Sequence, residues 1–307
     1  MEVLGLIVLN VILPVFALIV VGAFLHRKFS FDMNTLSKLS NYFLMPAIGF
    51  VNVYESKMAG EMLVAIIGFL LLQNLSLMIL AHGIAKVARF DKGLSATFKN
   101  SVVLNNSGNF GLPVSQLVFQ NNPVGASIQV IVMIFQNLIT YTYGLLNSVS
   151  TQHSQTSKII TEFLKLPILY ALLLGLLCNY FSITFPLFIW NPIENVANAF
   201  LAMALLTLGA QSAYLKITRI TLPLFLSLTG RLILSPVVAF ILIYCLRLEG
   251  TVAQALFIAS SFPSSRNSAL FALEYNNHPE YAAQTVLLST LVSSITVTVV
   301  VYLSNNL

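Results

Sequence analysis

Apolar runs long enough to cross a lipid bilayer recur along the whole of this 307-residue chain. A helix needs about 20 predominantly apolar residues to span about 30 Å of hydrocarbon. Hydrophobic residues make up 57% of the chain and charged residues only 8%, whereas soluble domains carry roughly 25% charged residues. No hydrophilic stretch is long enough to fold by itself, so the sequence predicts one all-α integral membrane domain.

Charged residues divide the chain into ten predicted spans: 3–25, 36–54, 62–85, 97–120, 124–147, 163–181, 194–213, 221–246, 251–275 and 281–303. An even number of spans places both termini on one side. The basic residues then gather on the other side, at Arg27, Lys28, Lys38, Lys86, Arg89, Lys92, Lys99, Lys158, Lys165, Lys216 and Arg219. Only Lys57 and Arg247 share the side of the termini, so the positive-inside rule predicts extracytoplasmic termini in the cell membrane. This distribution explains the net charge of +5 without a nucleic-acid partner.

The two halves of the chain share short motifs at similar spacing. LPVFALIVVG at 13–22 resembles LPILYALLLG at 166–175, and Asn41-Tyr-Phe-Leu resembles Asn198-Ala-Phe-Leu. Because each half has five predicted spans, the second half must enter the membrane inverted relative to the first. We therefore expect inverted repeats at 1–148 and 163–307, joined by a polar cytoplasmic linker at 149–162. Inverted repeats are an architecture of secondary transporters.

Predicted spans 4 and 9 both carry polar residues and helix breakers in their middle. Span 4 contains NNSGNFGLPV, and span 9 contains SSFPSSRNS. The residues that weaken or interrupt the helical hydrogen bonds are Gly108, Gly111, Pro113 and Pro263. Backbone groups released at membrane depth are tolerated only inside protein or beside a wet cavity. Ordinary kinks are the alternative interpretation, and paired breaks in the two halves favour a substrate site.

The residues after each break predict a site for an anion. Pro113 suits the first turn of a new helix, and Ser264 or Ser265 suits an N-cap. Two helix N-termini would then carry partial positive charge, to which Arg266 adds a full charge. A structural ion pair with Glu274 is the alternative role for Arg266.

Other polar residues lie at predicted membrane depth. Arg231 in span 8 is expected to be structural or gating, with substrate contact as the alternative, because a buried arginine faces a partner or a cavity. Hydrogen bonding between helices is the expected role of the remaining ones, Asn41, Asn74, Gln136, Asn137 and Asn198. Asn41, Asn137 and Asn198 are kept with Arg231 as secondary site candidates.

The run Asn106-Ser107-Gly108-Asn109-Phe-Gly111-Leu-Pro113-Val and the run Phe-Pro263-Ser264-Ser265 resemble the auxin efflux carrier family over essentially the full chain. The resemblance implies ten helices in two inverted repeats, with helices 4 and 9 broken and crossed at these runs. It also implies a scaffold of spans 1, 2, 6 and 7, and a transport unit of spans 3–5 and 8–10. Elevator-type transport of organic anions follows from it, with Asn106 and Asn109 as substrate contacts. Plant members have Asn-Pro-Asn where this chain has Asn106-Ser107-Gly108-Asn109, which argues against auxin itself.

Three other functions compete with anion transport. A sodium or proton symporter or antiporter needs an ionisable carboxylate near the site, and both aspartates, Asp32 and Asp91, lie in predicted loops. A channel or a transporter-like sensor is open as a further alternative. An enzyme is disfavoured, because no metal-ligand spacing or catalytic motif occurs and no cofactor is implied. The expected partners are a small organic anion, membrane lipid and, for this fold, a second copy in a homodimer.

Overall fold

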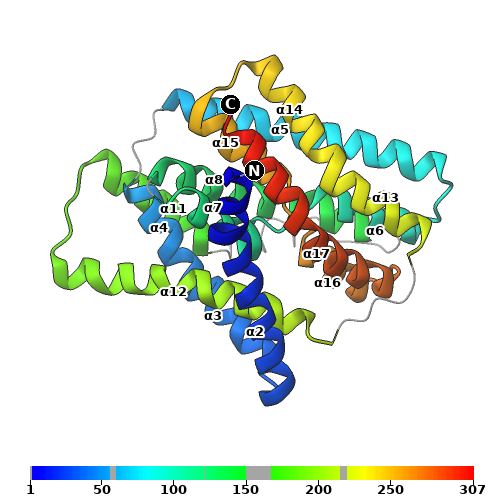
Figure 1. The fold of residues 1–307 in the computed structure, drawn as a ribbon, viewed down its shortest axis with the longest axis horizontal. Helices are drawn as coiled ribbons and strands as arrows, with labels where there is room; N and C mark the ends of the chain where they lie inside the picture. Colours follow the sequence, from blue (N-terminus) through cyan, green and yellow to red (C-terminus); the bar gives the residue numbers. More distant parts are fainter. Residues whose placement is uncertain (1, 56–59, 121, 150–166, 215–219) are drawn as a thin grey trace. The chain divides into compact units, whose positions relative to one another are not determined.

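The computed structural model describes residues 2–55, 60–120, 122–149, 167–214 and 220–307, and most of these residues lie in helices (Figure 1). Five of the helical segments are π-helical turns, labelled η. In chain order the segments are α1 (Glu2–Ile7), η1 (Val8–Ile12), α2 (Leu13–Phe29), α3 (Met33–Leu39), η2 (Ser40–Leu44), α4 (Met45–Glu55), α5 (Gly60–Val87), α6 (Lys92–Val103), η3 (Ser107–Gly111), α7 (Leu112–Val118), α8 (Pro123–Ile139), η4 (Thr140–Gly144), α9 (Leu145–Val149), α11 (Pro167–Tyr180), α12 (Leu187–Ser212), α13 (Leu222–Thr229), η5 (Gly230–Leu234), α14 (Ser235–Leu246), α15 (Gly250–Ser260), α16 (Arg266–Glu274) and α17 (Pro279–Ser304).

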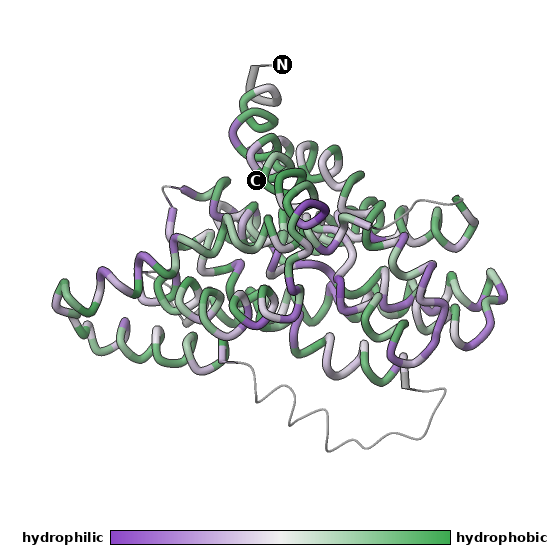
Figure 2. Tube along the Cα trace, turned by 90° about the horizontal axis from the view of Figure 1, so that it is seen from below, coloured by the Kyte–Doolittle hydropathy of each residue, from purple (hydrophilic) through white to green (hydrophobic). Residues whose placement is uncertain are grey.

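Figure 2 shows hydrophobic residues recurring along the helices of the chain. Among the described residues, six helices are long and apolar enough to cross a membrane. They are Gly5–Phe29, Met62–Val87, Pro123–Ser148, Leu187–Ser212, Leu222–Leu246 and Pro279–Ser304. These six match predicted spans 1, 3, 5, 7, 8 and 10. Predicted span 2 corresponds to α3, η2 and α4, whereas spans 4 and 9 are each divided into two shorter helices.

Parts of the prediction fall outside the described residues. These are residues 163–166 of predicted span 6 and, apart from Val149, the linker predicted at 149–162. The helix of span 6 is described from Pro167 to Tyr180. The total of ten crossings therefore stays a prediction.

The predicted start of span 7 is wrong. The helix α12 begins at Leu187 instead of residue 194, and Pro192 and Glu194 lie inside it. The prediction took the charge of Glu194 as a boundary. However, Glu194 is the eighth residue of α12, and glutamate is a good helix former, so its charge does not end the helix.

Prolines explain most of the π-helical turns. Four of the five turns end two residues before a proline, at Pro14, Pro46, Pro113 and Pro236. A proline has no N–H, and its ring clashes with the carbonyl four residues back. In a π turn the bond reaches five residues back, as from Met45 N–H to the carbonyl of Ser40, which widens the turn locally. A proline can therefore follow such a turn inside a continuous helix.

This arrangement corrects the predicted start of the second half of span 4. The helical segment begins at Ser107, in η3, and continues through α7. Pro113 lies in the first turn of α7 and not at the beginning of the half-helix. The predicted break is thus present, but it is confined to residues 104–106.

The chain divides into two compact units. Unit 1 comprises Met1–Ala59, Gly108–Ile134 and Leu164–Tyr214, and unit 2 comprises Gly60–Ser107, Phe135–Phe163 and Leu215–Leu307. Unit 1 includes the spans predicted to form a scaffold, together with Gly108–Ile134, which the prediction placed in the transport unit. The functional division into scaffold and transport unit stays a prediction.

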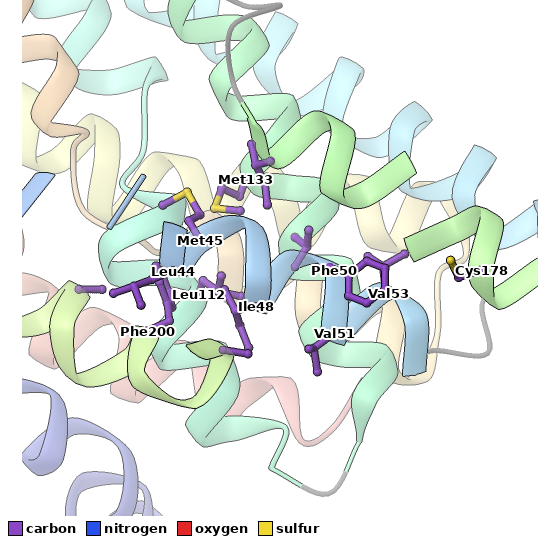
Figure 3. Close-up of a cluster of buried hydrophobic side chains, with 14 residues drawn as sticks. Leu44, Met45, Ile48, Phe50, Val51, Val53, Leu112, Met133, Cys178 and Phe200 are labelled. Carbon is purple, nitrogen blue, oxygen red and sulfur yellow. The ribbon is translucent and has the colours of Figure 1, made fainter. Parts of the chain in front are cut away.

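Unit 1 has an apolar core in which side chains from several helices meet (Figure 3). Leu44, Ile48 and Phe50 from η2 and α4 pack with Leu112 of α7 and Phe200 of α12. All five are buried. This core anchors the segment that immediately follows the break in span 4.

Glycines allow α2 and α12 to approach closely within unit 1. A Cβ atom on Gly209 would lie 1.9 Å from the carbonyl oxygen of Ile19, and one on Gly22 would lie 2.1 Å from that of Leu206. Both distances are far below van der Waals contact. Small residues are the usual means by which membrane helices approach one another so closely.

Replacement of Gly209 by Ala should therefore lower the free energy of unfolding, by about 1–3 kcal/mol, as expected for overpacking. The measurement is the thermal midpoint of the purified protein in detergent. The matched control is Gly68→Ala in α5, where an added Cβ meets nothing within 4 Å. The control should leave the midpoint unchanged or raise it, because alanine is the better helix former. Equal midpoints for the two variants would contradict the close approach of α2 and α12.

Candidate functional site

The two predicted interruptions are present and pair with each other within unit 2. The helix α6 ends at Val103, and the second break separates α15 from α16. Asn105 and Ser264 form an isolated antiparallel bridge. The N–H of Asn106 donates to the carbonyl of Pro263 at 2.8 Å, and the N–H of Ser265 donates to that of Leu104, also at 2.8 Å. Backbone groups released by one break are thus satisfied by the other.

Serine side chains hold this bridge in place. Ser264 Oγ donates to the carbonyl of Ser101 at 2.6 Å, and its N–H donates to Ser289 Oγ at 3.1 Å. Ser265 is the N-cap of α16, and its Oγ accepts from the N–H of Asn267 at 3.2 Å. The predicted N-cap is therefore confirmed at Ser265. The hydroxyl of Ser264 already bonds to the framework of the site.

Arg231 lies at the C-terminal ends of both interrupted helices. Its guanidinium donates to the carbonyl of Val102 at 2.9 Å, at the end of α6, and to that of Ser260 at 2.6 Å, at the end of α15. It also donates to Ser235 Oγ, which itself donates to the carbonyl of Ser260. The side chain is 1% exposed. A cation at two helix C-termini is favoured by both dipoles, which supports the structural role expected for Arg231.

This framework also includes three serines that were not predicted from the sequence: Ser101, Ser235 and Ser289. Ser235 follows Arg231 by four residues in span 8, and this spacing places two side chains on one helix face. That spacing was the only available signal for Ser235. Ser101 and Ser289 resemble the many other serines of the chain, and only the fold brings them to the break.

Arg266 is the first residue of α16 and is half-buried. A positive charge at a helix N-terminus opposes the helix dipole, so this position does not stabilise α16. Glu274 is exposed at the opposite end of the same nine-residue helix, about 12 Å away along its axis. Their placement at opposite ends disfavours the alternative of an ion pair between them.

Two asparagines beside the span 4 break have polar atoms without partners among the described residues. Asn106, in unit 2, is 6% exposed, and its Nδ2 has no hydrogen-bond partner there. Asn109, in η3 of unit 1, is half-buried, and its Oδ1 has none among the same residues. An unsatisfied buried polar atom costs about 1–3 kcal/mol, so each such atom calls for a ligand or a water.

The remaining break residues occupy η3 and the positions around it. Ser107 Oγ donates to Asn105 Oδ1. A Cβ on Gly108 would lie 3.1 Å from Met45 Cε, so this glycine packs against the unit 1 core. Gly111 is buried directly before α7.

Hydrogen bonding between helices is confirmed for two of the polar residues expected to make it, Asn74 and Gln136. Gln136 Nε2 donates to Asn74 Oδ1 at 3.0 Å, which joins α8 to α5 within unit 2. Asn41 and Asn198 are exposed, and the described residues offer them no hydrogen bond to another helix, so the expectation is wrong for both. Their faces of η2 and α12 point away from the core. Asn137 is half-buried, and its role stays a prediction.

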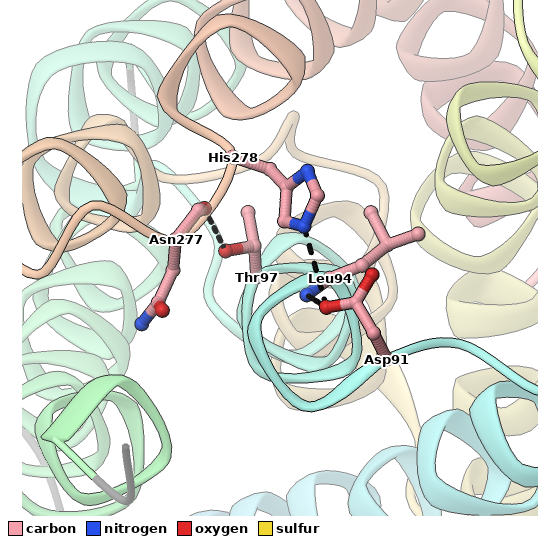
Figure 4. Close-up of polar contacts among 5 residues, drawn as sticks. All are labelled: Asp91, Leu94, Thr97, Asn277 and His278. Atoms are coloured by element: carbon pink, nitrogen blue, oxygen red, sulfur yellow. Dashed lines mark hydrogen bonds and ion pairs between the residues drawn. The ribbon is translucent and has the colours of Figure 1, made fainter. Parts of the chain in front are cut away.

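Polar contacts also join the beginning of α6 to the segment between α16 and α17 (Figure 4). Asp91 caps α6 by accepting from the N–H of Leu94 at 2.9 Å, and it lies 3.3 Å from Nε2 of His278. Thr97 Oγ1 donates to the carbonyl of Asn277 at 2.6 Å. These contacts join the ends of the two interrupted spans that lie farthest from the breaks. The pKa of Asp91 is lowered, mainly by the bond from Leu94 N–H and further by His278.

Replacement of Asp91 by Ala should lower the free energy of unfolding by about 1 kcal/mol at neutral pH, the usual cost of losing an N-cap. Because the folded pKa of Asp91 lies below its ordinary value of 3.8, its charge stabilises the fold above that value. This contribution should vanish as the pH falls through the lowered pKa. Thermal midpoints of both proteins measured from pH 7 down to pH 3 test this, and a difference that does not depend on pH would contradict it.

Comparison with known sequences identifies a family for this chain. A search of curated proteins found no match to the chain. The sequence profile of the family described as "Membrane transport protein" matches residues 7–301. This is a family of transporters and not of enzymes, and its match agrees with the apolar helices of the fold. The chain is therefore a multi-pass membrane protein that belongs to the membrane transport protein family, the family of the auxin efflux carriers whose motifs its sequence resembles.

Proposed function

We propose that this protein is a secondary transporter that carries a small organic anion, a carboxylate, across the cell membrane. The observation that carries the proposal is the group of donors at the paired breaks. There, Asn106, whose Nδ2 has no partner among the described residues, bonds through its backbone to Pro263. Arg266, three residues later, is the first residue of α16. Each of these groups offers N–H bonds or positive charge, and carboxylates accept both.

The electrostatics of Arg266 support an anionic ligand. Its charge lies at the positive end of α16, where it is repelled by the helix dipole. A bound carboxylate would offset both the charge and the dipole, as anions do at other helix N-termini. Ser265, Ser264 and Asn109 are the other residues proposed to hold the substrate.

Hydrogen bonds within each unit support ten crossings. Arg27 Nε donates to the carbonyl of Ala213 at 2.9 Å, and Tyr54 donates to that of Ile183 at 2.7 Å. The N–H of Gly250 donates to the carbonyl of Leu307 at 3.1 Å. In each of these bonds the ten-span topology predicts both partners on the same side of the membrane. The contact of Asp91 with His278 obeys the same rule.

Packing within unit 1 supports the inverted repeat. Gly22, in the first half, packs against the backbone of Leu206 in α12. Its predicted counterpart, Gly175, packs against the backbone of Phe50 in α4. A Cβ atom on Gly175 would lie 3.1 Å from the carbonyl oxygen of Phe50. Predicted spans 1 and 7 thus meet through a glycine, as do spans 6 and 2. Exchange of the two halves would convert one contact into the other.

We further propose elevator-type alternating access. The substrate would bind to the breaks of unit 2, and movement of this unit against unit 1 would expose the site first to one side of the membrane and then to the other. Inverted repeats with discontinuous helices near the bilayer midplane characterise transporters that work in this way. In this proposal unit 1 stays fixed while unit 2 moves, and a homodimer could form through the fixed unit.

The experiment is a binding screen of the purified protein against mono- and dicarboxylates, with and without sodium and at several pH values. Thermal stabilisation identifies a ligand, and saturable counterflow of that ligand in proteoliposomes then tests transport. Dependence of the uptake on sodium or pH would identify an ion-coupled carrier. Flux that does not saturate would indicate a channel, and binding without flux would indicate a sensor. Failure of every carboxylate to bind would contradict the proposal.

A further inference from the structure

A cavity with polar side chains in its lining lies in unit 2. Its volume is about 330 Å³, and the residues that line it come from α5, α6, η4 and α9: Met78, Ile79, His82, Lys99, Tyr143 and Asn147. We propose that this cavity binds the phosphate of an anionic glycerophospholipid. The proposal does not depend on the substrate that the protein transports.

The polar lining of the cavity favours an anion. Lys99 is half-buried, and no carboxylate lies among the residues that line the cavity in the described part of the chain. A charged side chain that is partly withdrawn from water needs a counter-charge. His82 and the hydroxyl of Tyr143 complete the set of groups that can donate. The oxygens of a phosphodiester accept hydrogen bonds and carry the required negative charge.

The helices that carry the lining residues are packed against one another, which fixes the position of Lys99. The neighbouring residues of α6, Phe98 and Val102, are buried in an apolar cluster with Leu77 of α5, and Tyr143 packs against this cluster. Asn147 Nδ2 donates to Asn100 Oδ1 at 3.1 Å, which holds α9 on α6. The cavity is therefore built on packed helices and not on a loose surface.

The face of α5 beside the cavity explains why a lipid fits better than a free anion. Leu72, Leu75 and Ile79 are exposed, and Ile79 reaches 64%. Exposed His82 and Lys86 continue the same face at helical spacing. The face is thus apolar toward the middle of the span and basic toward its end. An acyl chain along the leucines would bring its own phosphate to His82 and Lys99.

The depth of the cavity agrees with a headgroup. His82 lies five residues before the end of α5, or about 8 Å along the helix axis, and Lys99 lies seven residues after the start of α6. The positive-inside bias predicts that these helix ends are cytoplasmic. Basic pockets between membrane helices on that side are suited to anionic headgroups.

The test uses the purified full chain in a neutral detergent, titrated with phosphatidylglycerol, phosphatidylcholine or inorganic phosphate and followed by native mass spectrometry and thermal unfolding. Phosphatidylglycerol should bind and stabilise the protein, and Lys99→Gln should weaken that binding about tenfold, through loss of one charge-assisted contact. The matched control, Lys38→Gln, removes an exposed lysine of α3 and should bind as the wild type does. Tyr143→Phe removes one hydroxyl from the lining and should weaken binding even if Lys99→Gln does not fold.

Three outcomes would overturn the proposal. Equal binding of phosphatidylcholine would show that the apolar face alone holds the lipid. Equal stabilisation by inorganic phosphate would show a free-anion site. Wild-type affinity for phosphatidylglycerol in both Lys99→Gln and Tyr143→Phe would place the lipid elsewhere.

Discussion

Replacement of Arg266 by Gln is expected to lower anion transport about ten- to a hundredfold while the protein remains folded. The side chain is half-buried at the start of α16, where its charge is unfavourable for the helix. Loss of a hydrogen bond to a charged group costs about 1.5–3 kcal/mol, which gives this range. Removal of the charge also relieves its conflict with the helix dipole, so the thermal midpoint without substrate should stay constant or rise.

Initial uptake into proteoliposomes at several substrate concentrations is the measurement. The control is Arg247→Gln, which removes an exposed arginine of unit 2 after α14 and should transport as the wild type does. The opposite combination, a lower thermal midpoint with unchanged transport, would show that Arg266 is not part of the substrate site. It would make Arg266 a structural residue.

Replacement of Arg231 by Met is expected to have the opposite signature, a large loss of stability. The guanidinium satisfies the carbonyls of Val102 and Ser260, and methionine can bond to neither. The carbonyl of Val102 would lose the bond from the guanidinium, and that of Ser260 would keep only the bond from Ser235 Oγ. A hydrogen bond to a charged group typically contributes about 1.5–3 kcal/mol, so loss of the bonds to both helix ends should remove a large part of the stability of the protein.

The measurements for Arg231 are the yield of monodisperse protein and its thermal midpoint. Arg231→Lys keeps the charge but replaces the planar fork with a single ammonium, so it should recover part of the loss. A stable Arg231→Met protein without transport would instead support the substrate contact that the sequence left open as an alternative. The two arginines can thus be distinguished by which property each variant loses.

The breaks in predicted spans 4 and 9 could be located from the sequence because proline and clustered polar residues are rare in a helix that faces lipid. Pro263 and Ser265 illustrate this, since the observed break and the observed N-cap fall at them. Pro113 shows the limit of such reasoning. It is accommodated by the π turn before it, and a π turn depends on the packing around it as well as on the proline.

The chain by itself determined where two of its apolar segments are interrupted, and the concentration of N–H donors and positive charge after the interruptions. These properties are local, because they depend on hydrophobic length and on the missing N–H of proline. Only the tertiary structure decided that Asn105 pairs with Ser264, that Arg231 joins two helix ends, and that Asn41 and Asn198 face outward. Such contacts join residues far apart in the chain, and the residue type alone does not show whether an asparagine is exposed or buried. The direction of a side chain is set by the packing of its helix, which no local pattern contains.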